Sequence, residues 1–259
     1  MKITFLGTGT SQGVPIIGCK CNVCQSLDSK NKRLRTSVML EIADNNSKIK
    51  RFIIDTGPDF RQQLLREKVD SIDAVIYTHD HRDHVAGLDD IRALNYIMKK
   101  SVDLYATEST QKGIREQFSY IFKNANYPGL PEINFCTIEN KPFDIDGITF
   151  NPILVKHMHL PVLGFRIGGF TYITDANYIS EEEKNKIVGS DVLVLNALRM
   201  EPHPSHYTLN EAITLAQELK CKTTYLTHIS HQLGLHDEVE KKLPEGIKLA
   251  FDGLKLDVD

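Results

Sequence analysis

The chain has 259 residues, of which 41% are hydrophobic and 25% charged, as in an ordinary globular protein with a sizeable core. Its formal net charge of −3 excludes a long-range positive field that would draw the whole chain to nucleic acid or an anionic membrane. No run approaches the ~18 apolar residues of a membrane span, and the start MKITFLGTGT alternates like a strand, unlike a signal peptide. We therefore expect a cytoplasmic protein without a membrane partner, in which clustered cysteines bind metal more readily than they pair.

Predicted strands and helices interleave along the chain. Apolar runs and period-two alternation predict strands at residues 2–8, 36–42, 50–57, 74–79, 102–107, 148–157, 164–169, 170–175, 191–198, 223–228 and 248–256. Helical periodicity predicts helices at 59–66, 85–98, 109–122, 180–187 and 209–219. No linker, repeat or low-complexity tract divides the chain. The pattern predicts one α/β domain over residues 1–259, with two mixed β-sheets packed face to face and helices outside.

The first motif along the chain is GCKCNVC, in which Cys19, Cys21 and Cys24 fall within a few residues of one another. Three thiols suit no disulfide scheme, and a tetrahedral metal site needs a fourth ligand from elsewhere. Free or redox-active thiols are the alternative interpretation.

The strongest motif is THDHRDH, at the end of the predicted strand 74–79. His79 and His81 are two residues apart in an extended segment and point the same way, so both can reach one ion. Asp83 and His84 follow where a helix begins and can hold a second ion beside the first. Imidazole and carboxylate together suit zinc, manganese or iron.

The pattern H-x-H-x-D-H after a strand resembles the metallo-β-lactamase superfamily, and the whole chain resembles its PhnP-like phosphodiesterase branch. The resemblance runs from LGTGTSQGVPIIGCKCNVC through LTHISHQ to FDGLKL and covers essentially the whole chain. H-x-H-x-D-H is specific for the fold and for metals but not for a substrate. The cysteine motif combined with THISH is more specific for this branch. The resemblance implies a four-layer αββα sandwich.

Three further ligand-type residues each end a predicted strand: His157, Asp175 and His228. His159 is an alternative to His157 because the two are expected on the same strand face, although the spacing to the downstream LPVLGF favours His157. The resemblance implies a first metal on His79, His81 and His157, a second on Asp83, His84 and His228, and a bridging Asp175. The expected cofactors are two divalent ions, zinc or manganese, with iron as an alternative.

The segment LTHISHQ carries His231 three residues after His228. If the strand ends at His228, the following turn directs His231 toward the cysteines. Cys19, Cys21, Cys24 and His231 then form a closed Cys₃His set, which is typical of a structural zinc. We therefore expect a zinc knuckle at residues 19–24, closed by His231.

Other polar positions have expected roles outside the ligand set. His206 lies in a loop before the helix at 209–219, and the related proteins carry a histidine there, so we expect a general acid or a phosphate contact. Asp83 is expected to share in catalysis, and His203 to be a solvent-exposed loop residue. Asp55 either orients a ligand histidine or caps a turn. The basic segment 30–35 is expected to be a solvated face, or a charge that attracts an anionic substrate.

Two adjacent ions would activate a bridging water and stabilise the charge that grows on the attacked centre. We therefore predict a metal-dependent phosphodiesterase whose partner is a small phosphate diester, cyclic diesters included. The hydrolase alternatives are a tRNA 3′-processing nuclease, which the lack of a basic arm argues against, and a lactonase or thioester hydrolase. The non-enzymatic alternative is an accessory protein like the pyrroloquinoline-quinone branch, which the complete ligand set argues against. The sequence leaves a homodimer open.

Overall fold

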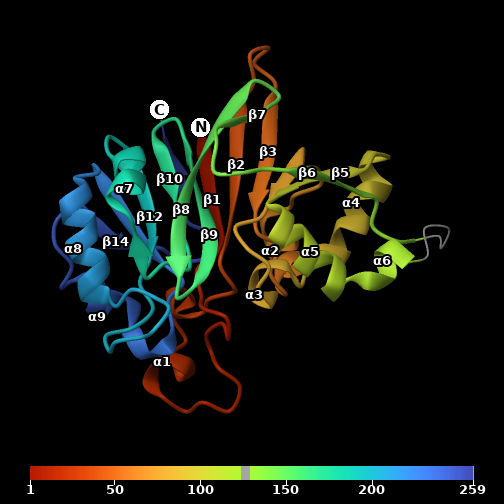
Figure 1. Ribbon diagram of the computed structural model, residues 1–259. Helices are drawn as coiled ribbons and strands as arrows, with labels where there is room; N and C mark the ends of the chain where they lie inside the picture. Colours follow the sequence, from red (N-terminus) through yellow and green to blue (C-terminus); the bar gives the residue numbers. More distant parts are fainter. Residues whose placement is uncertain (124–128, 259) are drawn as a thin grey trace.

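The computed structural model describes residues 1–123 and 129–258, so residues 124–128 and 259 of the expected domain lie outside the description. The described residues form two mixed β-sheets packed face to face (Figure 1). One sheet has seven strands in the order β15-β1-β2-β3-β4-β5-β6. Their bounds are β1 Lys2–Gly7, β2 Ser37–Ala43, β3 Ile49–Ile54, β4 Ala74–Ile76, β5 Val102–Ala106, β6 Ile133–Thr137 and β15 Lys255–Asp257.

The second sheet of the described residues has eight strands, with the order β11-β8-β9-β10-β12-β13-β14 and with β7 paired to β8. Their bounds are β7 Phe143–Ile145, β8 Ile148–His157, β9 Leu160–Ile167, β10 Phe170–Tyr172, β11 Tyr178–Ile179, β12 Val192–Asn196, β13 Thr223–Thr227 and β14 Ile247–Leu249. The longest hairpin is β8–β9, in which Asn151 pairs with Arg166 at one end and His157 with Leu160 at the other.

Each sheet is buried on both faces because its strand residues alternate between two apolar cores. In β3, Phe52 enters the core between the sheets, while its neighbour Ile53 packs against the helices of the first sheet. In β12, Val194 enters the same central core, while Leu195 packs against the helices of the second sheet. This alternation produces four layers and confirms the expected α/β architecture.

The helices form the two outer layers (Figure 1). Outside the first sheet lie α2 Phe60–Glu67, α3 Arg82–Val85, α4 Ile91–Met98, α5 Glu108–Gln117 and α6 Ser119–Lys123. Outside the second lie α7 Glu181–Ile187, α8 Leu209–Leu219 and α9 His236–Glu240, and the short α1 Asn22–Gln25 lies in the cysteine segment. Helix α8 has the predicted bounds, and a capping box of Thr208 with Glu211 fixes its start.

The prediction of one strand at 248–256 is wrong. Strand β14 ends at Leu249 in the second sheet, and β15 begins at Lys255 in the first. Between them, the Leu254 N–H donates to the Phe251 carbonyl at 3.1 Å, and Gly253 takes a φ of 86°, which glycine adopts at no steric cost. The segment therefore passes from one sheet to the other.

Two predicted helices are each divided in the structure. The one at 85–98 becomes α3, a 3₁₀ turn at Leu88–Asp90 and α4, and the one at 109–122 becomes α5 and α6. Strands β6, β7 and β11 and helices α1 and α9 were not predicted.

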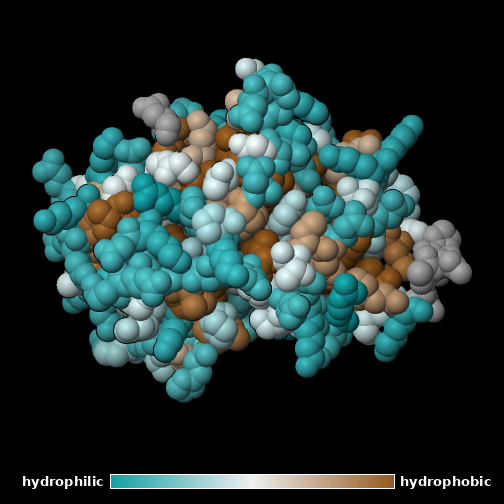
Figure 2. Space-filling view, turned by 45° about the horizontal axis from the view of Figure 1, so that its top comes forward, coloured by the Kyte–Doolittle hydropathy of each residue, from teal (hydrophilic) through white to brown (hydrophobic). Residues whose placement is uncertain are grey.

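The two ends of the described chain lie side by side, and the Met1 amino group donates to the Val258 carbonyl at 2.8 Å (Figure 1). Hydrophilic side chains cover most of the face in Figure 2, with apolar side chains in separate groups. Across the described ranges, no helix has both the length and the apolar character that crossing a membrane requires.

Candidate metal centre

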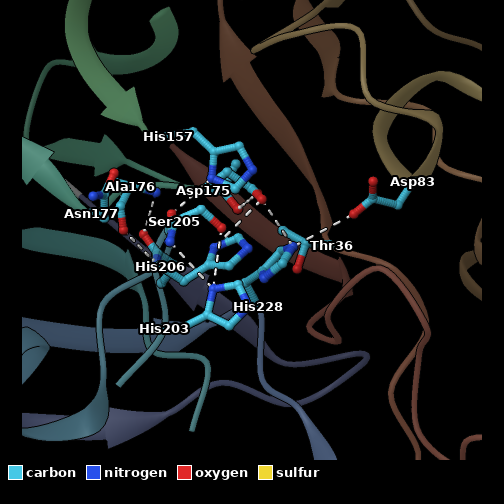
Figure 3. A network of polar contacts seen from close by, with 12 residues as sticks. Thr36, Asp83, His157, Asp175, Ala176, Asn177, His203, Ser205, His206 and His228 are labelled. Atoms are coloured by element: carbon cyan, nitrogen blue, oxygen red, sulfur yellow. Dashed lines mark hydrogen bonds and ion pairs between the residues drawn. The ribbon is translucent and has the colours of Figure 1, made fainter. Parts of the chain in front are cut away.

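The ligand-type side chains meet at one end of the sandwich. His157 is the last residue of β8, Asp175 follows β10, and His228 directly follows β13. His79 and Asp83 come from the other sheet, between β4 and the first turn of α3. In Figure 3, His157, Asp175 and His228 point toward one another, and Asp83 approaches from the opposite side.

Three overlapping groups of ligand atoms form at this point, and within each group all atoms lie within 4.8 Å of one another. The groups are His79–His84–Asp175, Asp83–His84–His228 and His157–Asp175–His206. Asp175 lies between two histidines, with its Oδ1 3.3 Å from His228 Nε2 and its Oδ2 3.1 Å from His84 Nε2. Asp175 therefore presents one carboxylate oxygen to each of two buried histidines.

Several buried nitrogen atoms of the centre lack hydrogen-bond partners. Within the described part of the chain, this holds for Nε2 of His79, His84 and His228. A buried polar atom without a partner is costly, and a cation would satisfy all three. The donor set therefore fits divalent metal, because imidazole and carboxylate are its usual protein ligands.

The electrostatics of the centre keep the carboxylates of Asp83 and Asp175 ionised. Burial by itself would raise the pKa of Asp175, but His228 and His84 outweigh burial and hold that pKa well below its usual range. The pKa of Asp83 is held below its usual range in the same way, against burial, by the nearby His84 and His228. Burial and the nearby His84 lower the pKa of His79, which leaves this imidazole neutral and able to bind a cation.

Asp55 fixes the orientation of His84. Of the two roles expected for Asp55, the structure therefore favours orienting a histidine over capping a turn. The Oδ2 of Asp55 accepts the Nδ1–H of His84 at 2.7 Å and the hydroxyl of Thr78 at 2.8 Å, and its Oδ1 accepts the Thr78 N–H at 2.9 Å. Because Nδ1 donates to Asp55, Nε2 is the atom of His84 that faces the centre. Asp175, Asp83 and Asp55 outweigh burial and raise the pKa of His84, so an ion that binds here would displace the proton from Nε2. Helix α3 can approach this closely because residue 57 is glycine: a Cβ there would lie 2.2 Å from the Asp83 carbonyl oxygen.

Three residues of the centre have left-handed backbone conformations. The φ angles are 65° at Asp55, 51° at Asp175 and 56° at His228. For a residue other than glycine this conformation costs roughly 1 kcal/mol or more. The sharp turn lets the side chain at a strand end face the centre, and the surrounding sheets stabilise it.

The histidines around strand β8 differ in position. His81 is exposed and belongs to none of the three groups, although its ring lies 4.6 Å from that of His79 and 5.1 Å from that of His157. The expectation that His157 and His159 share a strand face is wrong, because β8 ends at His157 and Met158 turns with a φ of 56°. His159 is exposed, whereas His157 donates its Nδ1–H to the Ser205 carbonyl at 2.8 Å.

His206 is buried beside the centre. Its Nδ1 lies 3.7 Å from Asp175 Oδ1, and its ring lies 4.7 Å from that of His228. Burial and the neighbouring His228 lower its pKa to about 2, so the imidazole is neutral at neutral pH. His203 is half-buried with its ring 5.1 Å from His206, so the expectation of a solvent-exposed residue is wrong. The signal for this was the spacing HPSH, which places both histidines in one short loop.

The cysteine segment forms a second cluster. The ligand atoms of Cys19, Cys21, Cys24 and His231 lie within 4.8 Å of one another. His231 Nδ1 is 3.5 Å from Cys19 Sγ and 3.3 Å from Cys21 Sγ. Hydrogen bonds from His231 and the Cys24 N–H lower the pKa of Cys21 to about 6, whereas burial raises that of Cys24 to about 11. Four such donors fit a closed tetrahedral zinc, which would displace the remaining thiol protons.

The basic segment 30–35 is not a solvated face. Arg33 is buried and donates to the Thr8 hydroxyl at 2.8 Å and the Ala250 carbonyl at 2.6 Å, and its Nη2 lies 3.0 Å from His236 Nδ1. Arg35 pairs with Asp59 at 3.1 Å. These contacts join the segment after the cysteines to the C-terminal part of the chain, and the charge pattern alone gave no sign of them.

Comparison with known proteins agrees with this architecture. A solved structure of a diphosphatase from the PhnP family is 42% identical, with a TM-score of 0.91 over 100% of this chain and 98% of that one. An octanoyltransferase of Porphyromonas gingivalis is 39% identical over all of this chain, which spans only 52% of that protein. The coenzyme PQQ synthesis protein B of Methylorubrum extorquens is 31% identical over 78% of this chain and 74% of its own length. Residues 50–229 match the beta-lactamase superfamily domain, and the chain belongs to that superfamily.

Proposed function

We propose that the protein is a metal-dependent hydrolase that cleaves small phosphate diesters, cyclic diesters included. One observation carries this proposal: three buried Nε2 atoms without partners surround the carboxylate of Asp175, which lies between His84 and His228. When bound, two divalent ions supply an activated water and stabilise the charge that develops on the phosphoryl group. The residues that would hold them are His79, His81, His157, Asp83, His84 and His228, with Asp175 between the two sites.

The protein supplies orientation to this centre. Asp55 keeps the proton of His84 on Nδ1, and the Ser205 carbonyl does the same for His157, so each Nε2 faces the centre. The carboxylates of Asp83 and Asp175 stay ionised and offset the positive charge of two cations. The donor set contains no thiolate, which suits hard, oxyanionic substrates such as phosphodiesters.

His206 is the proposed proton donor to the leaving group. Its Nδ1 is buried and without a hydrogen-bond partner among the described residues, and it lies beside Asp175. Its low pKa in the substrate-free protein means that it carries no charge before substrate binds. The neutral imidazole would first take up the proton that the attacking water releases, which an adjacent phosphodiester anion favours, and would then pass it to the departing alkoxide. A simple phosphate contact is the alternative role for the same residue.

The relatives support hydrolysis at phosphorus more than acyl chemistry. The PhnP-family diphosphatase matches this chain over its full length, whereas the octanoyltransferase is matched over about half of its own. We therefore do not propose acyl transfer for this chain, which matches only about half of the octanoyltransferase. For the cluster of Cys19, Cys21, Cys24 and His231 we propose a structural zinc, because its four ligands leave no open position.

The test is a substrate panel with metal-reconstituted protein: bis-p-nitrophenyl phosphate, 2′,3′-cyclic nucleotides, a 1,2-cyclic ribose phosphate, pre-tRNA and an acyl lactone. We expect turnover of the diesters by the parent and by His159→Ala, whose side chain is exposed outside the centre. His81→Ala and Asp175→Ala should lose that turnover while remaining folded. Turnover of only the lactone or only the pre-tRNA would contradict the proposal.

A further inference from the structure

A loop of residues 199–206 carries His206 between β12 and α8. Its base is closed by main-chain hydrogen bonds: the Leu198 N–H donates to the Tyr207 carbonyl, and the Leu209 N–H to the Arg199 carbonyl, both at 3.0 Å. The Ser230 N–H also donates to the Leu198 carbonyl at 3.0 Å. The base of the loop is thus hydrogen-bonded to the segment that joins His228 of the metal centre to His231 of the cysteine cluster.

The half-buried Arg199 donates from its guanidinium to two carbonyls of this loop. Its Nε donates to the Glu201 carbonyl at 3.1 Å and its Nη2 to the Pro202 carbonyl at 2.8 Å. Its Nη1 donates to Gln232 Oε1 at 3.1 Å, and Gln232 directly follows the zinc-type ligand His231. A planar fork of donors can hold three acceptors in fixed directions, which a lysine ammonium on its flexible stem cannot reproduce.

The second half of the loop, residues 203–206, contacts residues of the metal centre. The Pro204 carbonyl accepts from Asn177 Nδ2 at 3.2 Å, and the Ser205 carbonyl accepts from His157 Nδ1 at 2.8 Å (Figure 3). His203 Nδ1 accepts from the Ser205 hydroxyl at 3.2 Å, and its ring lies against that of His206. Arg199 therefore binds the first half of a loop whose last two residues are Ser205, which contacts His157, and His206.

We infer that Arg199 is a positioning residue that sets the place of His206 relative to Asp175 and couples it, through Gln232, to the cysteine cluster. This inference rests on the proposed function, in which His206 protonates the leaving group. A proton donor displaced by about 1 Å can lose as much as 10²-fold in rate, even when the change lies away from the reacting atoms.

The experiment compares two leaving groups in matched variants. In Arg199→Gln, kcat for a diester with an alkyl leaving group should fall roughly ten- to a hundredfold. The rate with bis-p-nitrophenyl phosphate should change little, because p-nitrophenolate departs without protonation. Arg199→Lys should recover only part of the loss, and Gln232→Ala should show a smaller loss of the same kind. Metal content should equal that of the parent in all of them.

Arg166→Gln is the control. Its guanidinium also donates to loop carbonyls, those of Gly168, Lys186 and Val188, but at the far end of the β8–β9 hairpin from His157. It should leave both rates unchanged. In a His206→Ala background, Arg199→Gln should cause no further loss, because it acts through the side chain already removed. Equal losses on both substrates, or an additive loss in the double variant, would overturn the inference.

A readout that needs no activity separates this inference from the proposed function. The ¹⁵N imidazole resonances of His206 should move in Arg199→Gln and in Gln232→Ala, but not in Arg166→Gln. A parent that hydrolyses no diester yet shows these shifts refutes the proposed function and keeps the positioning role. Unchanged resonances refute the positioning role, whatever the parent hydrolyses.

Discussion

Replacing Asp55 by asparagine should weaken metal binding at the centre without unfolding the protein. Asparagine tolerates the left-handed backbone at this position, where φ is 65°, and its Oδ1 can still accept the Thr78 N–H. Its Nδ2, however, is a donor that faces His84 Nδ1, where the carboxylate accepted a proton at 2.7 Å. The clash of two donors favours a proton on His84 Nε2, which removes the lone pair that an ion needs.

The expected loss is roughly 10- to 100-fold in metal affinity, as is usual when a group that orients a ligand is changed. This corresponds to about 1.4–2.8 kcal/mol of binding free energy per ion. Competition with a chromophoric chelator measures the metal affinity of the centre directly, provided that any zinc on the cysteine cluster is quantified separately. Thermal melting of the metal-loaded variant checks that the fold is retained.

Glu183→Gln is the matched control. Glu183 is also a buried carboxylate that accepts a backbone N–H, that of Leu154 at 2.8 Å, but it lies on α7, away from the centre. Its amide variant should bind metal like the parent. An Asp55→Asn protein with parent affinity, or an equal loss in both variants, would refute the orienting role of Asp55.

Three more predictions concern other parts of the molecule. His206→Ala should keep its metals yet lose roughly 10²–10⁴-fold in rate with alkyl leaving groups and much less with p-nitrophenolate; steady-state kinetics decide, and an unchanged rate on both substrates removes His206 from the site. Cys21→Ser should lower Tm by about 5 °C, since ~2 kcal/mol has this effect in a chain of this size, and activity should decline as His228 moves with His231; parent-like melting with full activity would contradict the structural zinc. Burial and the adjacent Arg33 lower the pKa of His236 to about 4, against ~6.5 in the unfolded chain, so the unfolding free energy should fall as pH drops from about 6.5 to about 4. Urea titrations at pH 4.5 and 7 give the unfolding free energy at each pH, and in His236→Gln the difference between the two values should be smaller than in the parent. An equal difference in both proteins would show that His236 does not titrate as described.

The sequence predicted the elements and residues whose positions depend on local spacing. THDHRDH places His79, Asp83 and His84 within one strand-to-helix turn, so their convergence follows from the chain direction alone. Strand-end positions likewise predicted that His157, Asp175 and His228 would come together, because strand ends of a packed sandwich share an edge. The confirmed two-sheet architecture came from the alternation of strands and helices.

Features that depend on distant contacts were not predictable in the same way. Arg33 reads as part of a charged run, yet it is buried because Thr8, Ala250 and His236 meet it from far along the chain. The apolar pattern of 248–256 continues through a turn at Gly253, so local periodicity could not divide it between two sheets. His203 faces His206 only because the loop closes on itself at Leu198 and Tyr207.

We propose that two adjacent ions act together around Asp175. A chelator is used to strip the centre while the proposed zinc of the cysteine cluster stays in place, and diester hydrolysis is then measured as divalent metal is returned in steps. If both ions are needed, activity should appear mainly with the second equivalent, for a total of about three ions per chain by elemental analysis. Full activity with one equivalent, or none after two have bound, would contradict this proposal.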